Sequence, residues 1–353
     1  MKAQRPGAIL GGRSLLVRAP NWVGDLVMAT PVLEAALADG RFERVTVAVR
    51  AHLLPVLRGG PVVPHVLSLA RGDDESARLA AVGADAALLL PNSFGAAWRA
   101  FRARIPLRAG ASLSWRGFLL THRVIPPTER GRRAPIPTAH LLRDVAGLLG
   151  ISVPSLHPRL YFDAGDAREA RAALAERGLL PGERYAVACP GAAFGAAKLW
   201  PPERFAAALD ALYRERGLRG VATGGPGEEG LIEAVAGAAQ SPVISLAGAP
   251  RDLHRLKPLI AGTELLLVGD SGPRWYAAAF DVPCVTVMGP NHPLLTASSL
   301  EWCTVVRKED LDCSPCMERV CPLGHHRCMQ DLPVERVLAA ARALLDRRPA
   351  VPA

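Results

Sequence analysis

The chain has 353 residues, half of them apolar, which is enough for two domains of about 150 residues and excludes a disordered protein. No stretch approaches the roughly 18 apolar residues of a membrane span, and no apolar segment of a signal peptide precedes the first expected strand. We therefore expect a soluble, cytoplasmic protein without a transmembrane segment. The net charge of +9 favours anionic partners such as nucleotides, nucleic acids or an anionic membrane surface.

The first half of the chain alternates short apolar runs with helical patterns. Such alternation is typical of parallel strands joined by crossover helices. After Gly150 the pattern breaks, and a charged helix that ends before Gly178 is expected next. The strands predicted in this half are 15–17, 45–49, 66–69 and 86–90, and the helices are 75–82, 94–103 and 166–177.

The alternation begins again in the second half. Two α/β domains in tandem, over residues 1–165 and 166–353, are therefore the simplest arrangement, and a cleft between such domains is a common place for a substrate. The strands predicted in the second half are 185–189, 218–222, 243–245, 265–268 and 284–288, and the helices are 203–216, 273–280 and a last helix at 334–345.

Small or polar residues follow four of the strands predicted in the second half. They are Pro-Gly-Ala-Ala at 190–193, Gly-Gly-Pro-Gly-Glu at 224–228, Asp-Ser-Gly at 270–272 and Gly-Pro-Asn at 289–291. All four would lie at one edge of a parallel sheet, where glycines let backbone N–H groups approach a phosphate and helix N-termini add positive charge. One such turn is weak evidence, because tight turns need glycine anyway. Four at the same edge favour a nucleotide site.

Three charged residues beside these clusters each have a binding and a structural interpretation. Lys198, one of only four lysines, could reach a diphosphate or could be an ordinary solvated loop lysine. Glu228 could accept hydrogen bonds from ribose hydroxyls or could favour a helix N-terminus. Asp270 could bind sugar hydroxyls or could cap a helix.

Asp25 comes shortly after the first predicted strand, in Asn-Trp-Val-Gly-Asp at 21–25. A carboxylate at the mouth of an α/β sheet is well placed to act as a general base. The alternative is a helix cap, which is the commoner role of an aspartate in this position. The nucleotide-type edge of the second half favours the role of a base, because a nucleotide-linked substrate bound there would supply the group with which the deprotonated substrate reacts.

The order of these motifs resembles that of the ADP-heptose:lipopolysaccharide heptosyltransferase II group of glycosyltransferase family 9. The resemblance runs from about Leu15 to Pro293. Its motifs are Asn-Trp-Val-Gly-Asp at 21–25, Leu-Pro-Asn-Ser-Phe at 90–94, the run from Cys189 to Pro201 and Asp-Ser-Gly at 270–272. It implies a GT-B fold, with two Rossmann-like domains whose parallel sheets face each other across a cleft. The first domain would bind the acceptor and the second the donor.

The same resemblance implies an inverting transfer of heptose from ADP-heptose, without a cofactor or a catalytic metal, to the first heptose of the lipopolysaccharide inner core. The acceptor would lie at the cytoplasmic face of the inner membrane, where the enzyme could be peripheral. Heptosyltransferases of the I or III type are the nearest alternatives. By the family pattern the base is Asp25, and the donor is bound by Gly191, Lys198, Glu228, Asp270, Ser271 and Gly272.

The chain departs from the family pattern at Trp275, where many relatives carry a histidine. Two consequences are compatible with the sequence. Arg274 could supply the positive charge that such a histidine would bring to the donor phosphates, or donor affinity could be lower. For Trp275 itself we expect a core or cleft-wall aromatic.

Four of the seven cysteines lie close together in the sequence near its end. In a cytosolic protein, this spacing suggests thiolate ligation of a structural metal ion more than disulfides, although an iron–sulfur site or free thiols also fit. The same cluster would suit a basic nucleic-acid-binding protein. Low aromatic content and basic residues dispersed along the chain argue against that class. The cysteines are Cys313, Cys316, Cys321 and Cys328.

Overall fold

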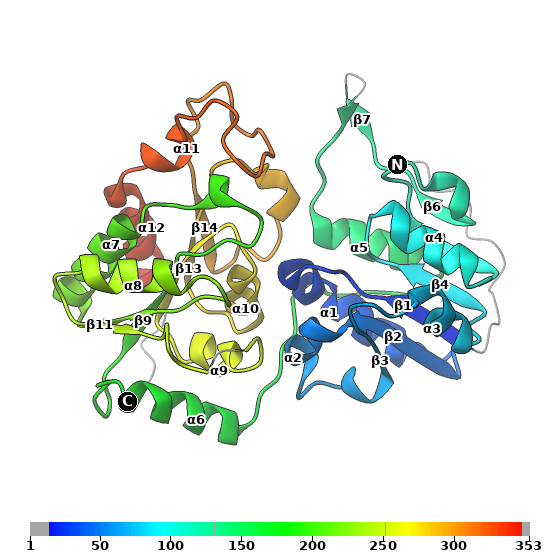
Figure 1. The fold of residues 1–353 in the computed structure, drawn as a ribbon, viewed down its shortest axis with the longest axis horizontal. Coiled ribbons are helices and arrows are strands. Elements are labelled where there is room, and N and C mark those ends of the chain that lie inside the picture. Colours follow the sequence, from blue (N-terminus) through cyan, green and yellow to red (C-terminus); the bar gives the residue numbers. More distant parts are fainter. Residues whose placement is uncertain (1–13, 130–131, 251, 348–353) are drawn as a thin grey trace. The chain divides into compact units, whose positions relative to one another are not determined.

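The computed structural model of the chain describes residues 14–129, 132–250 and 252–347. Strands and helices alternate along all of these residues, from blue through green to red in Figure 1. The chain divides into two compact units. Unit 1 is Met1–Tyr161 with Leu294–Ser298, and unit 2 is Phe162–Pro293 with Ser299–Ala353.

Unit 1 is built around a six-stranded parallel sheet in the order β3-β2-β1-β4-β5-β6. The central strand β1 (Ser14–Arg18) is buried along its whole length, as expected for a strand that helices cover on both faces. Its Leu15 pairs with Val45 on one side and Ala86 on the other. The remaining strands are β2 (Arg44–Arg50), β3 (Val66–Leu69), β4 (Ala86–Leu89), β5 (Leu107–Ala111), β6 (His122–Val124) and the antiparallel pair β7 (Thr128–Glu129) and β8 (Arg132–Arg133).

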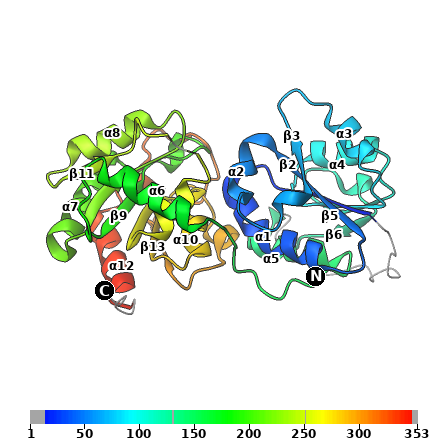
Figure 2. The ribbon, with the colours of Figure 1, turned by 90° about the horizontal axis from the view of Figure 1, so that it is seen from below.

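Helices cover both faces of this sheet. Helix α1 packs against α5 and helix α3 against α4, and Figure 2 shows the two pairs on opposite sides of the strands. Leu16 of the sheet, Leu79 of α3 and Ala97 of α4 share one buried cluster. The helices of unit 1 are α1 (Val23–Ala38), α2 (Leu54–Leu57), α3 (Glu75–Ala81), α4 (Phe94–Arg102) and α5 (Thr138–Gly147), with short 3₁₀ turns at η1 (Ala51–Leu53), η2 (Val63–His65) and η3 (Gly117–Leu119).

Unit 2 repeats this topology with its own six-stranded parallel sheet, in the order β11-β10-β9-β12-β13-β14. The central strand is β9 (Tyr185–Cys189), which is again fully buried. Because all pairs in the sheet are parallel, the carboxyl ends of the strands lie at one edge. The other strands are β10 (Arg219–Ala222), β11 (Val243–Ser245), β12 (Leu265–Gly269), β13 (Cys284–Val287) and β14 (Cys303–Val306).

Two groups of helices cover the second sheet. Helix α7 packs against α8 and α12, and helix α9 packs against α6 and α10. Leu209 of α7 and Leu338 of α12 belong to the main buried cluster of this unit. The helices are α6 (Ala164–Ala175), α7 (Pro202–Arg216), α8 (Glu229–Ala238), α9 (Leu256–Ala261), α10 (Pro273–Ala279), α11 (Arg327–Gln330) and α12 (Val334–Arg347), with a 3₁₀ turn at η4 (Ala196–Lys198). A further 3₁₀ turn, η5 (Pro293–Thr296), begins at the last residue before the segment that belongs to unit 1.

The α/β class with parallel sheets is confirmed. Every strand predicted from the apolar runs is present within one or two residues of its expected bounds. The sequence did not predict β5, β6 and β14. In two of them polar residues or glycine interrupt the apolar run: β5 contains Arg108 and Gly110, and β6 contains His122 and Arg123. Their places at or near the sheet edges relax the demand for a continuous apolar strand.

Candidate functional site

The glycine-rich clusters of unit 2 follow β9, β10, β12 and β13, so they meet at the carboxyl edge of its sheet. This edge is called the donor edge below. In open α/β sheets ligands bind beyond the carboxyl ends of the strands. The structure therefore brings together the segments from which the sequence predicted a nucleotide site.

Lys198 and Asp270 form an ion pair at the donor edge. The Lys198 ammonium lies 2.5 Å from Asp270 Oδ2 and also donates to the Asp270 carbonyl at 3.1 Å. Asn291 Nδ2 donates to the same carboxylate at 2.6 Å. Phe194 covers the ammonium, with its ring centroid 4.7 Å away. The side chains of the pair are only 11% and 7% exposed, so Lys198 is not the solvated loop lysine that the sequence also allowed.

Glu228 packs against glycine at the same edge. Its carboxylate accepts a hydrogen bond from the Gly225 amide at 2.7 Å. A Cβ atom on Gly191 would lie 2.0 Å from Glu228 Cδ, and one on Gly224 would lie 2.8 Å from Oε2. The Glu228 carboxylate keeps this position only beside a glycine at 191, because a Cβ atom there would displace it. The structure thus places Gly191 and Glu228, which the sequence predicted as separate site residues, directly against each other.

Ser271 and Gly272 lie where β12 passes into α10. The Ser271 hydroxyl is buried and has no hydrogen-bond partner among the described residues. A buried hydroxyl without a partner costs about 1–3 kcal/mol, so it is an unusual feature that a bound ligand would relieve. Gly272 has φ −53°, in the ordinary helical region, so its backbone conformation does not require glycine.

Trp275 and Arg274 lie in the interior of unit 2. Trp275 is 4% exposed, which confirms the expected core aromatic. Arg274 is 1% exposed, lies 4.5 Å from the Trp275 ring and donates from Nε to Cys303 Sγ at 3.3 Å. These contacts direct the guanidinium into the packed interior. They do not support a substitute role of Arg274 at the donor phosphates.

Residues 313–328, called the cysteine segment below, contact the donor edge. The Ala197 amide, beside Lys198, donates to the Arg319 carbonyl at 3.0 Å. The Met317 amide donates to the carbonyl of Pro290, in the loop that follows β13, at 2.8 Å. The segment thus fixes two of the loops that form the donor edge.

The structure does not support the predicted metal site. Over the described residues, no group of three or more His, Cys, Asp or Glu side chains is arranged to hold a metal ion. The four thiols nevertheless influence one another. Burial, and then the charges of Cys316, Cys321 and Cys313, raise the pKa of Cys328 to about 11. A hydrogen bond from the His326 amide lowers the pKa of Cys321.

Asp25 lies in the first turn of α1, at the carboxyl edge of the unit 1 sheet. The capping residue of this helix is Trp22, whose side chain makes no capping hydrogen bond. The alternative in which Asp25 is the N-cap is therefore wrong. A carboxylate in the first turn is still stabilised by the helix dipole. Its position at this edge is compatible with the predicted role of a base.

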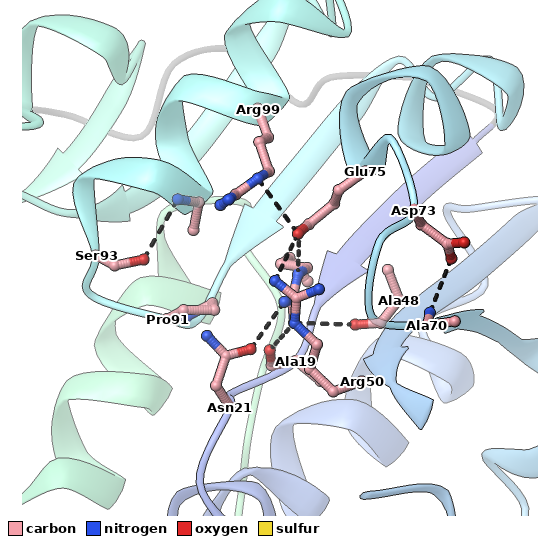
Figure 3. A network of polar contacts seen from close by, with 12 residues as sticks. Ala19, Asn21, Ala48, Arg50, Ala70, Asp73, Glu75, Pro91, Ser93 and Arg99 are labelled. Atoms are coloured by element: carbon pink, nitrogen blue, oxygen red, sulfur yellow. Dashed lines mark hydrogen bonds and ion pairs between the residues drawn. The ribbon is translucent and has the colours of Figure 1, made fainter. Parts of the chain in front are cut away.

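The loop that carries Asp25 is fixed by a buried ion network. Arg18, the last residue of β1, donates to Glu75 Oε1 at 2.7 Å and to Asn21 Oδ1 at 2.8 Å. Glu75, whose side chain is 3% exposed, also pairs with Arg50 at 2.8 Å and with Arg99 at 3.5 Å. Figure 3 shows Asn21, Arg50, Glu75 and Arg99 converging on this network. Asn21 is thereby tied to the sheet, and the first turn of α1 follows directly.

A second buried arginine fixes the next loop of this edge. Arg116 is fully buried and donates to the Ala111 carbonyl at 2.8 Å, to the Pro91 carbonyl and to Asn92 Oδ1 at 3.4 Å. Burial lowers its pKa to about 10. An arginine in a basic stretch such as 99–116 is usually solvated, whereas Arg116 is fully buried. The sequence carried no signal for it, because its partners are mainly backbone carbonyls.

The chain matches the sequence profile of glycosyltransferase family 9 (heptosyltransferase) over residues 76–327. It therefore belongs to this family. The predicted resemblance is confirmed. Among its curated relatives are lipopolysaccharide heptosyltransferase 2 of Escherichia coli, 28% identical over 94% of this chain and 98% of the relative, and lipooligosaccharide heptosyltransferase 2 of Haemophilus ducreyi, 24% identical over 94% and 99%.

Solved structures of the family share the fold of this family 9 chain. E. coli ADP-heptose lipopolysaccharide heptosyltransferase II has a TM-score of 0.73 and 25% identity, over 95% of this chain and 99% of that one. A family 9 glycosyltransferase from Veillonella parvula has a TM-score of 0.78 at 20% identity, over 98% and 99%. The GT-B class that the motifs predicted is confirmed by these likenesses.

Proposed function

We propose that this chain transfers L-glycero-D-manno-heptose from ADP-heptose to the first heptose of the lipopolysaccharide inner core, with inversion at the anomeric carbon. The observation that carries the proposal is the donor edge, where a largely buried ammonium, a carboxylate packed against glycine and a hydroxyl without a hydrogen-bond partner lie in one family 9 unit. The near full-length similarity to second heptosyltransferases favours this acceptor.

In the proposal, unit 2 holds the donor. Lys198 stabilises the negative charge of the diphosphate, and this charge increases as ADP leaves. Before the donor binds, Asp270 holds the ammonium in place, and Asn291 donates a hydrogen bond to the Asp270 carboxylate. Glu228 accepts hydrogen bonds from the ribose, against the bare backbone of Gly191. The Ser271 hydroxyl donates to a phosphate or sugar oxygen and so gains the partner that it lacks.

Unit 1 supplies the base in this proposal. Asp25 removes the proton of the acceptor hydroxyl while the hydroxyl oxygen attacks the anomeric carbon. The new C–O bond forms as the bond to the phosphate oxygen breaks, and ADP leaves with the electron pair. A single displacement of this kind inverts the anomeric centre. No step requires a cofactor.

The acceptor is a membrane lipid, so we propose that the enzyme works at the cytoplasmic face of the inner membrane. Over the described residues, no helix has the length and apolar character needed to cross a bilayer. Attachment would then be peripheral, and the net charge of +9 favours an anionic surface.

The test offers the purified protein ADP-heptose together with an acceptor that carries one heptose or with a heptose-free acceptor. We expect ADP release and a product heavier by one heptose only with the one-heptose acceptor. Transfer only to the heptose-free acceptor would assign the first-heptosyltransferase type instead. If ADP-heptose is consumed with neither of the two acceptors, the proposal is wrong.

A further inference from the structure

Five aromatic side chains form an exposed surface on unit 1, called the aromatic face below. Apart from Trp22, they are the only Phe and Trp residues among the exposed large hydrophobic side chains of the described residues. Three belong to α4 and two lie at or beside η3. The members are Phe94, Trp98, Phe101, Trp115 and Phe118, which are 42%, 42%, 46%, 94% and 75% exposed.

The rings of the aromatic face contact one another. Phe94 and Trp98 stack with their centroids 6.3 Å apart, and Trp98 and Phe101 stack at 5.7 Å. Phe118 joins them at 6.2 Å from Phe94. The spacing 94, 98, 101 places three of the rings on one side of α4, while Ala96, Ala97 and Ala100 are buried beneath the helix. The result is a continuous apolar surface on an amphipathic helix.

Trp115 is held outward by a tight loop. Ser114 and Trp115 both have positive φ, 50° and 60°, which side-chain-bearing residues rarely adopt. The next residue is the fully buried Arg116, whose side-chain hydrogen bonds fix the loop to the segments that follow β4 and to the end of β5. An indole that is 94% exposed at the end of so firmly anchored a loop has no packing role inside the unit.

Positive charge surrounds these rings. Residues 94–128 contain six arginines and no aspartate or glutamate. Arg102 and Arg104 are exposed, and Arg108 lies 5.4 Å from the Phe101 ring. In this part of the fold, basic and aromatic residues are thus gathered, although basic residues are dispersed over the chain as a whole.

We propose that the aromatic face docks onto the surface of an anionic phospholipid bilayer. Indole and phenyl rings partition into the interfacial region of a bilayer, and arginines beside them bind anionic head groups. Stacking of Trp98 with Phe94 and Phe101 leaves its ring less open to nucleic-acid bases, which need free aromatic faces. The charge also disfavours a second copy, because two arginine-rich faces would repel each other.

Membrane docking of the aromatic face would serve the proposed transfer reaction, and this part of the inference rests on the proposed function. Phe94 and Trp115 follow β4 and β5, and Asp25 follows β1. These strands are parallel neighbours in one sheet, so all three residues lie at its carboxyl edge. A bilayer on the aromatic face would bring the head group of a lipid acceptor to the edge that carries the base.

The experiment measures sedimentation of the full chain with vesicles of phosphatidylcholine alone, or mixed with phosphatidylglycerol in equal parts. We expect binding to the mixed vesicles and little to phosphatidylcholine. Trp115→Ser with Phe118→Ser should weaken partition at least about tenfold, the scale for two large apolar groups. Arg102→Glu with Arg104→Glu should do the same. Leu180→Ser and Arg168→Glu, exposed positions in unit 2, are the matched controls and should change little.

Other measurements separate this inference from the proposed function. Transfer to a water-soluble, delipidated acceptor should be unchanged in the aromatic-face variants, which also verifies their folding. Vesicle binding that equals the wild type in these variants would overturn the inference while leaving the transferase intact. Two other results would also overturn the inference. One is a dimer of the wild-type chain that forms without lipid and is lost in Trp115→Ser. The other is tighter binding of the chain to single-stranded RNA than to the mixed vesicles. Vesicle binding without any heptose transfer would overturn only the proposed function.

Discussion

In unit 1, buried arginines fix the loops at the carboxyl edge, whereas in unit 2 glycines and partly enclosed charges form the corresponding edge. Arg18 and Arg116 use their guanidinium groups on partners inside unit 1. Lys198 and Ser271 of unit 2 lie at the edge itself, and the Ser271 hydroxyl has no partner among the described residues. Two sheets of the same topology thus carry one edge whose buried arginines are paired internally and one edge with a buried hydroxyl that lacks a partner.

The largest expected effect tests the satisfied edge. Glu75→Gln should lower the free energy of unfolding by about 3–5 kcal/mol, because it leaves Arg18 buried and Arg50 and Arg99 nearby without a counter-charge. Urea unfolding measures it. Asp73→Asn, which removes the exposed pair with Arg78, is the control and should cost no more than about 1 kcal/mol. Equal effects of the two substitutions would mean that the network does not stabilise unit 1.

The second test concerns Asp25, the proposed base at the carboxyl edge of unit 1. Asp25→Asn should reduce kcat by about 100-fold or more, the usual scale for loss of a general base, and should leave ADP-heptose affinity nearly intact. Steady-state kinetics and calorimetry measure the two quantities. Asp39→Asn, just beyond the end of α1, is the control. Unchanged turnover in Asp25→Asn would remove this residue from its role.

The third test concerns the ammonium of unit 2. Lys198→Met should lower kcat/KM for ADP-heptose by about 30-fold, since a charge-assisted hydrogen bond contributes about 1.5–3 kcal/mol. Lys308→Met is the control, because that lysine pairs with Asp310 on the surface. If ADP inhibits the Lys198 variant as strongly as the wild type, the ammonium does not bind the diphosphate.

The smallest effect concerns the glycine beside Glu228. Gly191→Ala should raise the KM for ADP-heptose about tenfold, because the added Cβ displaces the carboxylate and breaks its bond to Gly225. Glu228→Ala should give a similar loss, and the double variant should add nothing to it. Gly237→Ala in α8, where nothing lies within 4 Å of the added Cβ, is the control. Additive losses would show that the two residues act independently.

The sequence by itself determined the strands of both sheets other than β5, β6 and β14. It also determined the glycine-rich donor edge, the place of Asp25 after β1 and the family. These features depend on short apolar runs, on glycine at strand ends and on motifs a few residues long, so neighbouring residues are sufficient to indicate them. The roles of the site residues remain predictions.

Only the tertiary structure decided which charges are buried and what they hold. Arg18 and Glu75 are 57 residues apart, and their pairing arises because β1 and the start of α3 meet beyond a shared sheet edge. A buried arginine and a solvated one have the same letter in a sequence, and the cost of burial is offset by partners from distant segments. For the same reason, the sequence could not predict that the aromatic rings of 94–118 gather on one surface.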